Sequence, residues 1–123
     1  MKQIFILFFF SLTLNAADIR SLLFNGNCIT CHEEHKTVSA PSIKLIKENY
    51  LRAFPIKEEF VTFMSKWILK PNKETSIMLD SIKKHGLMPE LGYDISTLKE
   101  ISAYIYDTDF TKKQLLRTKQ LEY

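Results

Sequence analysis

This chain of 123 residues has no sequence repeat, no strand-like pattern and few glycines. No stretch alternates polar and apolar residues with the period of a β-strand, so we expect an all-α fold. Only three glycines are present, which is few for a fold with many tight loops. Only two cysteines are present, so the chain lacks the second, distant ligand pair that zinc folds usually supply.

The chain also lacks a large excess of basic or acidic residues. The chain carries 17 basic and 14 acidic residues, a formal net charge of +3. A nucleic-acid-binding domain usually has a much stronger basic patch, so nucleic acid is not an expected partner.

The one long apolar run lies at the N-terminus. Lys2 precedes a stretch of about 11 mostly apolar residues, Ile4 to Leu14, and Ala16 and Ala17 follow it. A membrane-spanning helix needs about 20 residues, so residues 1–16 are predicted to be a secretory signal peptide, cut after Ala16 or Ala17. No cysteine lies near this cut, which excludes lipid attachment there. We expect export to the periplasm, with an uncleaved signal that tethers the domain to the membrane as the alternative.

Removing residues 1–16 leaves 107 residues, enough for one domain. The approximate ranges of the five helices expected in it are 18–24, 43–51, 57–69, 73–84 and 97–107. A turn is expected at residues 25–27. Asn72 is expected to cap the fourth helix and Gly86 to end it, while Thr97 and Glu100 can form a capping box for the last.

Apolar residues in these segments recur at the spacing of a helix. In the first helix, Ile19, Leu22 and Leu23 are expected on one face. In the last helix, the expected buried stripe is Leu98, Ile101 and Ile105.

The most informative motif is the pentapeptide CITCH, residues 28–32. Cys28, Cys31 and His32 fall on one side of a helical turn, because residues three and four apart are neighbours there. This spacing is typical of c-type haem attachment, in which two thiols bind the haem vinyl groups and the histidine binds the iron. A redox disulfide and a zinc site that also uses His35 are the alternatives.

The chain resembles the class I monohaem cytochromes c over about residues 18–110. Besides CITCH, the resemblance rests on Met88-Pro89 in a loop before the last helix, and on Pro41, nine residues after His32. Charged residues replace the glycine that often follows the motif in that family.

The resemblance implies a cytochrome c-like fold of four to five short helices around one covalent haem c. The expected domains are the signal peptide 1–16, a cytochrome c domain 17–110 and a basic tail 111–123. Cys28 and Cys31 would attach the haem, and His32 and Met88 would bind the iron. The carbonyl of Pro41 would accept a hydrogen bond from His32 Nδ1.

The resemblance also implies that the first and last helices cross, with Phe24 and Tyr104 as members of the crossing. Trp67 would bind a haem propionate or simply belong to the core.

Other residues have alternative or simpler roles. Among the methionines, Met88 is the expected iron ligand because Met64 and Met78 are expected in helix interiors. Its main rival as ligand is His85, three residues earlier. His35 is expected to be exposed to solvent. The lysines expected to form a solvated surface are Lys36, Lys44, Lys47, Lys83 and Lys84.

The function implied is electron transfer, not enzymatic catalysis. A haem with two side-chain ligands has no open position for a small-molecule substrate, so redox proteins of a respiratory chain would be its donor and acceptor. Two alternatives are a five-coordinate haem that senses a gas or acts as a small peroxidase, and a haem-relay subunit of a larger respiratory complex.

Overall fold

The computed structural model describes residues 16–112, and this part of the chain is all-helical. Its five helices are α1 (Ala16–Asn27), α2 (Ile43–Ala53), α3 (Lys57–Leu69), α4 (Leu79–His85) and α5 (Ile95–Asp107). No strand occurs among the described residues, so the expected all-α class is confirmed. Residues 1–15 of the expected signal peptide and most of the tail lie outside them, whereas Ala16 begins α1. No helix between residues 16 and 112 is both long and apolar enough to cross a membrane.

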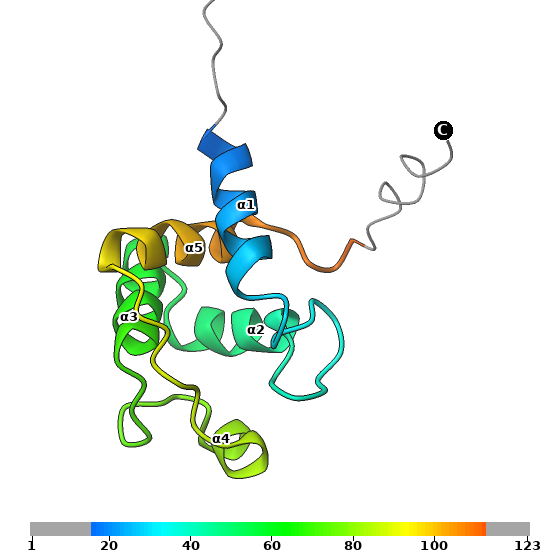
Figure 1. Cartoon of the computed structure of the whole chain (residues 1–123), viewed down its shortest axis with the longest axis vertical. Coiled ribbons are helices and arrows are strands. Elements are labelled where there is room, and N and C mark those ends of the chain that lie inside the picture. Colours follow the sequence, from blue (N-terminus) through cyan, green and yellow to red (C-terminus); the bar gives the residue numbers. More distant parts are fainter. Residues whose placement is uncertain (1–15, 113–123) are drawn as a thin grey trace, which may run out of the picture.

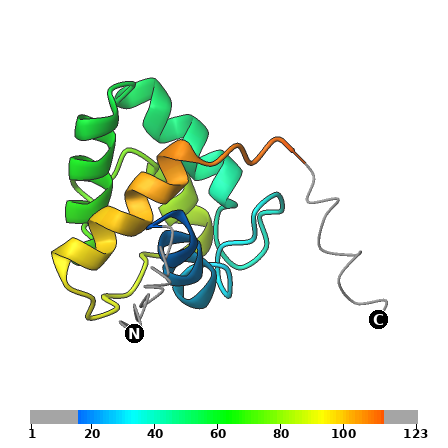
Figure 2. The same cartoon turned by 90° about the horizontal axis from the view of Figure 1, so that it is seen from above.

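Helix α5 lies at the centre of the packing (Figures 1 and 2). It packs against α3 and α1 and also contacts α2. The rings of Phe24 on α1 and Tyr104 on α5 lie 5.0 Å apart, centroid to centroid, which confirms the expected contact between the first and last helices. The expected buried residues of α5, Leu98, Ile101 and Ile105, are all at most 3% exposed.

The core is rich in aromatic rings. Phe60 of α3 packs edge-on against Tyr106 and Tyr50, with centroids 5.1 and 5.6 Å away. Phe24 packs against Phe110 beyond the end of α5. Burial raises the pKa of Tyr50 to about 12, because the phenolate would lose its hydration. These contacts bring α1, α2, α3 and α5 into one cluster.

Helix α1 is longer than expected and buries a different face. The turn predicted at residues 25–27 is helical, because Asn25 and Asn27 donate side-chain hydrogen bonds to the carbonyls four residues earlier instead of ending the helix. Ile19 and Leu22, expected on one apolar face with Leu23, are 46% and 72% exposed. Among residues 19–27 of this helix, Phe24 is the buried one, with Leu23 packed beside it.

Helix α4 is shorter than expected. The predicted helix 73–84 begins only at Leu79, and residues 73–78 form a turn and bends without helical structure. Asn72 does accept a hydrogen bond from the backbone N–H of Glu74, at 2.7 Å, but this bond closes a local turn and does not cap a helix. Gly86 ends α4 as expected, with φ 86° and its N–H bonded to the carbonyl of Ile82.

The other helix boundaries follow side-chain caps. Ser42 caps α2 through a 3.2 Å hydrogen bond from Leu45 N–H, and α3 has the expected bounds. Helix α5 begins two residues before the expected start, because Asp94 accepts a hydrogen bond from Thr97 N–H and is the cap. The capping box predicted from Thr97 and Glu100 is therefore wrong.

Helix α4 stands apart from the cluster (Figure 1). Among the helices between residues 16 and 112, it alone has no backbone packed closely against another helix, and none of its residues is fully buried. The space between α4 and the cluster is a cavity.

Candidate functional site

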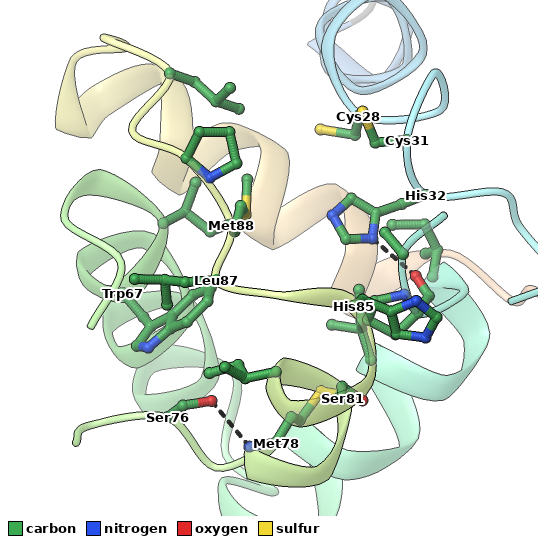
Figure 3. Close-up of a pocket in the computed structure, with 18 of the residues that line it drawn as sticks. Cys28, Cys31, His32, Trp67, Ser76, Met78, Ser81, His85, Leu87 and Met88 are labelled. Atoms are coloured by element: carbon green, nitrogen blue, oxygen red, sulfur yellow. Dashed lines mark hydrogen bonds between the residues drawn. The ribbon is translucent and has the colours of Figure 1, made fainter. Parts of the chain in front are cut away.

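The cavity has a volume of about 290 Å³ and a predominantly apolar lining. It lies between the turn after α1, helix α4 and the loop that leads to α5 (Figure 3). The lining residues that could bind or position a ligand are Asn27, Cys28, Cys31, His32, Trp67, Ser76, Met78, Ser81, His85, Met88 and Tyr93. All four residues predicted to hold a cofactor, Cys28, Cys31, His32 and Met88, are therefore brought to one place.

The CITCH segment continues from α1 as a helical turn. Cys28 N–H donates to the carbonyl of Phe24, and His32 N–H donates to the carbonyl of Cys28, both at 2.9 Å. The turn directs both cysteines and the histidine to the same cavity, as the spacing predicts. Because Phe24 is completely buried, the turn is anchored to the core.

The two cysteines are free thiols with different surroundings. Cys31 is exposed, whereas Cys28 packs partly against the core. Burial, with a smaller effect of the neighbouring Cys31, raises the pKa of the Cys28 thiol to about 11.

His32 is oriented by the loop that follows the motif. The distance from its Nδ1 to the carbonyl oxygen of Pro41 is 2.7 Å, which confirms the expected contact. The loop is held in place because Ile43 N–H donates to the carbonyl of Glu33 at 2.9 Å. A hydrogen on Nδ1 leaves the Nε2 lone pair free to bind a metal ion.

Met88 lies on the opposite side of the cavity, with its side chain facing His32 (Figure 3). His85, at the end of α4, also lines the cavity but projects from the same side as His32 in this view. The expectation that Met78 lies in a helix interior is wrong. It precedes α4 and lines the cavity as well, because residues 73–78 are not helical. Of the two candidate ligands, Met88 is the one that faces His32.

Trp67 lines the cavity, but its indole N–H is already engaged. It donates to the carbonyl of Asn72 at 2.9 Å, across the turn that follows α3. This bond gives Trp67 a structural role in the turn, in addition to its contact with the cavity.

Residues outside the cavity include His35 and Lys47. His35 is 42% exposed and lies 3.6 Å from a carboxylate oxygen of Glu34, so its expected exposure is confirmed. Lys47, expected to be solvated, is partly buried, and its ammonium donates to the carbonyls of Tyr106 and Thr108 at 2.7 and 2.5 Å. That expectation is wrong because Lys47 faces the C-terminal end of α5.

The alternative zinc site is not assembled in the described part of the chain. Between residues 16 and 112, no three His, Cys, Asp or Glu side chains lie close enough together to hold a metal ion. The arrangement proposed from Cys28, Cys31, His32 and His35 would need such a group.

Two residues at the cavity were not singled out from the sequence. The Tyr93 hydroxyl, in the loop after Met88, donates to Asn27 Oδ1 at the end of α1 at 2.6 Å. The two residues lie 66 positions apart, and no spacing or composition pattern links them. The position of Asn27 immediately before the first cysteine is the only available signal.

Comparison with known proteins adds no further assignment, since no family model, curated protein or solved structure matches the chain.

Proposed function

We propose that this chain is a small exported c-type cytochrome that carries single electrons between redox proteins. One haem c is attached through Cys28 and Cys31 and ligated by His32 and Met88. The observation that carries the proposal is that His32 and Met88 face each other across an apolar cavity that both cysteines also line.

The residues present fit a haem. An imidazole nitrogen and a thioether sulfur are a known pair of haem iron ligands, and two thiols can form thioether bonds to the vinyl groups. The apolar lining suits the flat body of a porphyrin. Ser76 and Ser81 lie at the end of the cavity away from the cysteines, where they suit a polar edge (Figure 3).

A bound haem would supply an iron that takes up and releases one electron. The chain's own residues hold and tune it. The Pro41 carbonyl fixes the ring of His32 so that Nε2 is directed into the cavity. The Met88 thioether is a soft donor that favours reduced iron and raises the reduction potential relative to a histidine ligand.

If His32 and Met88 both held the iron, no position on it would remain for a substrate. This favours an electron carrier over an enzyme or a gas sensor. In this proposal residues 1–16 direct export to the periplasm, where redox proteins are the donor and the acceptor.

The test is covalent haem attachment in bacterial cells that mature c-type cytochromes. The periplasmic fraction is run on a denaturing gel and stained for haem peroxidase activity. We expect a stained wild-type band, no stain for Cys28→Ala/Cys31→Ala, and normal stain for the control His35→Ala, whose side chain lies outside the cavity. A wild-type band without stain would overturn the proposal.

A further inference from the structure

The loop that carries Met88 has few fixed points. Residues 87–93 follow Gly86, and Gly92 lies near their end, and both glycines have positive φ, 86° and 73°. Within residues 16–112, the hydrogen bond between the Tyr93 hydroxyl and Asn27 Oδ1 is the only one made by any residue of this loop. Without that bond, little besides apolar contact would hold the loop against the cavity.

The other end of this hydrogen bond is rigid. Asn27 is the last residue of α1 and immediately precedes Cys28. Its side-chain amide donates to the carbonyl of Leu23 at 2.6 Å, which orients Oδ1, and the helix is anchored by the buried Phe24. The Tyr93–Asn27 bond therefore connects the segment that holds Met88 directly to the segment that holds Cys28, Cys31 and His32.

We propose that the Tyr93–Asn27 hydrogen bond is a clasp that positions Met88 across the cavity from His32. This inference rests on the proposed ligation by His32 and Met88. Tyr93 is a positioning residue, because it acts through the loop that carries the ligand. The clasp reduces the fraction of molecules in which Met88 is displaced, and only those molecules can bind an added ligand at the same position.

The experiment measures imidazole binding to the oxidised holoprotein by absorption spectroscopy. Tyr93→Phe removes only the hydroxyl, and loss of one partly buried hydrogen bond should tighten imidazole binding roughly three- to tenfold. Tyr106→Phe is the matched control: its hydroxyl donates to the carbonyl of Pro55 at 2.9 Å, and it does not line the cavity. The control should bind imidazole like the wild type.

A second pair of variants tests the same bond from its other end. Asn27→Leu removes the acceptor for the Tyr93 hydroxyl and should tighten imidazole binding to the extent that Tyr93→Phe does. The double variant Tyr93→Phe/Asn27→Leu should show no further gain, because both changes remove one interaction.

The outcomes separate the clasp from the function it rests on. Equal effects of Tyr93→Phe and Tyr106→Phe, or additive effects in the double variant, would overturn the clasp and leave the cytochrome intact. A wild type with covalent haem but without the weak long-wavelength band of methionine ligation would overturn both the clasp and the ligation by Met88. A wild type without covalent haem would overturn the proposed function as well.

Discussion

Met88 and His85 stand three residues apart on either side of the bend at Gly86, and both line the cavity. Only Met88 faces His32 (Figure 3). We predict that Met88→Ala changes the iron ligation and lowers the reduction potential, because the proposed thioether ligand, a soft donor that favours reduced iron, is lost. His85→Ala should leave the iron ligation and the reduction potential unchanged. Absorption spectra of the oxidised protein and a redox titration measure the two effects.

The reverse result would identify a different ligand pair. If His85→Ala and not Met88→Ala converts a low-spin haem to a high-spin one, bis-histidine ligation replaces the proposed pair. A high-spin wild type would favour the five-coordinate sensor or peroxidase.

Lys47 on α2 stabilises the fold by binding the end of another helix. Its ammonium bonds to two carbonyls at the C-terminal end of α5, where the negative end of the helix dipole also attracts a cation. Partial burial lowers its pKa from the ordinary value, partly offset by Asp109 and Asp107. We predict that Lys47→Met reduces the free energy of unfolding by about 1–2 kcal/mol, because the two carbonyls lose their charged partner.

Denaturant unfolding of the holoprotein measures this change, and Lys44→Met is the control on the same helix. Lys44 makes only a 4.0 Å exposed ion pair with Glu48, so its loss should cost less than about 0.5 kcal/mol. Equal losses for the two variants would contradict the assigned role of Lys47.

At the scale of the element, the start of α5 depends on one ionised side chain. The Asp94 carboxylate accepts hydrogen bonds from the Ser96 hydroxyl and from the backbone N–H and hydroxyl of Thr97. These bonds hold the pKa of Asp94 well below its ordinary value. The group therefore contributes stability that is complete above the unfolded-state pKa of about 3.9 and is lost as pH falls toward the folded-state value.

We predict that wild-type stability decreases below about pH 4 more steeply than that of Asp94→Asn, whose amide does not titrate. Asp94→Ser, which keeps a capping hydroxyl, should share the shallower pH dependence while retaining more of the helix cap. Unfolding free energies measured by circular dichroism across this pH range make the comparison. Parallel profiles for all three proteins would show that Asp94 is not a source of the acid sensitivity.

The helices that the sequence predicted well are those whose signals are local. Helix α3, for example, has the predicted bounds because its apolar residues recur at helical spacing along its length. Helix α4 was predicted six residues too early because Asn72 is a good cap by residue type. In the folded chain Asn72 instead closes a turn and accepts the indole N–H of Trp67, a contact that residue type does not encode.

At the scale of the whole molecule, the residues of the candidate site also fall into two groups: those that a local pattern predicted and those that depend on packing. Cys28, Cys31 and His32 lie within one turn, so their spacing was sufficient to predict that they meet at one site. Met88 and Pro41 were found only through resemblance to a family. The Tyr93–Asn27 and Lys47–Tyr106 contacts join residues 66 and 59 positions apart and depend on how the helices pack, which no local pattern determines.

At the scale of the whole molecule, the unequal packing of the helices predicts which segment the proposed haem would stabilise most. Helix α4 has seven residues, too few to be stable alone. Its Ile82 lines the cavity, and its backbone packs closely against no other helix between residues 16 and 112. We therefore expect the haem to be its main packing partner. Amide exchange in Leu79–His85 should be at least about tenfold slower in the holoprotein than in the haem-free Cys28→Ala/Cys31→Ala chain.

Helices α3 and α5 are the internal reference for this measurement. They bury Phe60, Met64 and Ile101 against each other and the rest of the cluster, so part of their protection should survive without the haem. Hydrogen exchange followed by mass spectrometry on both proteins resolves the two regions. If α4 and the α3–α5 pair lost protection to the same extent, the haem would support the whole core uniformly, and α4 would not be the segment that depends on it most.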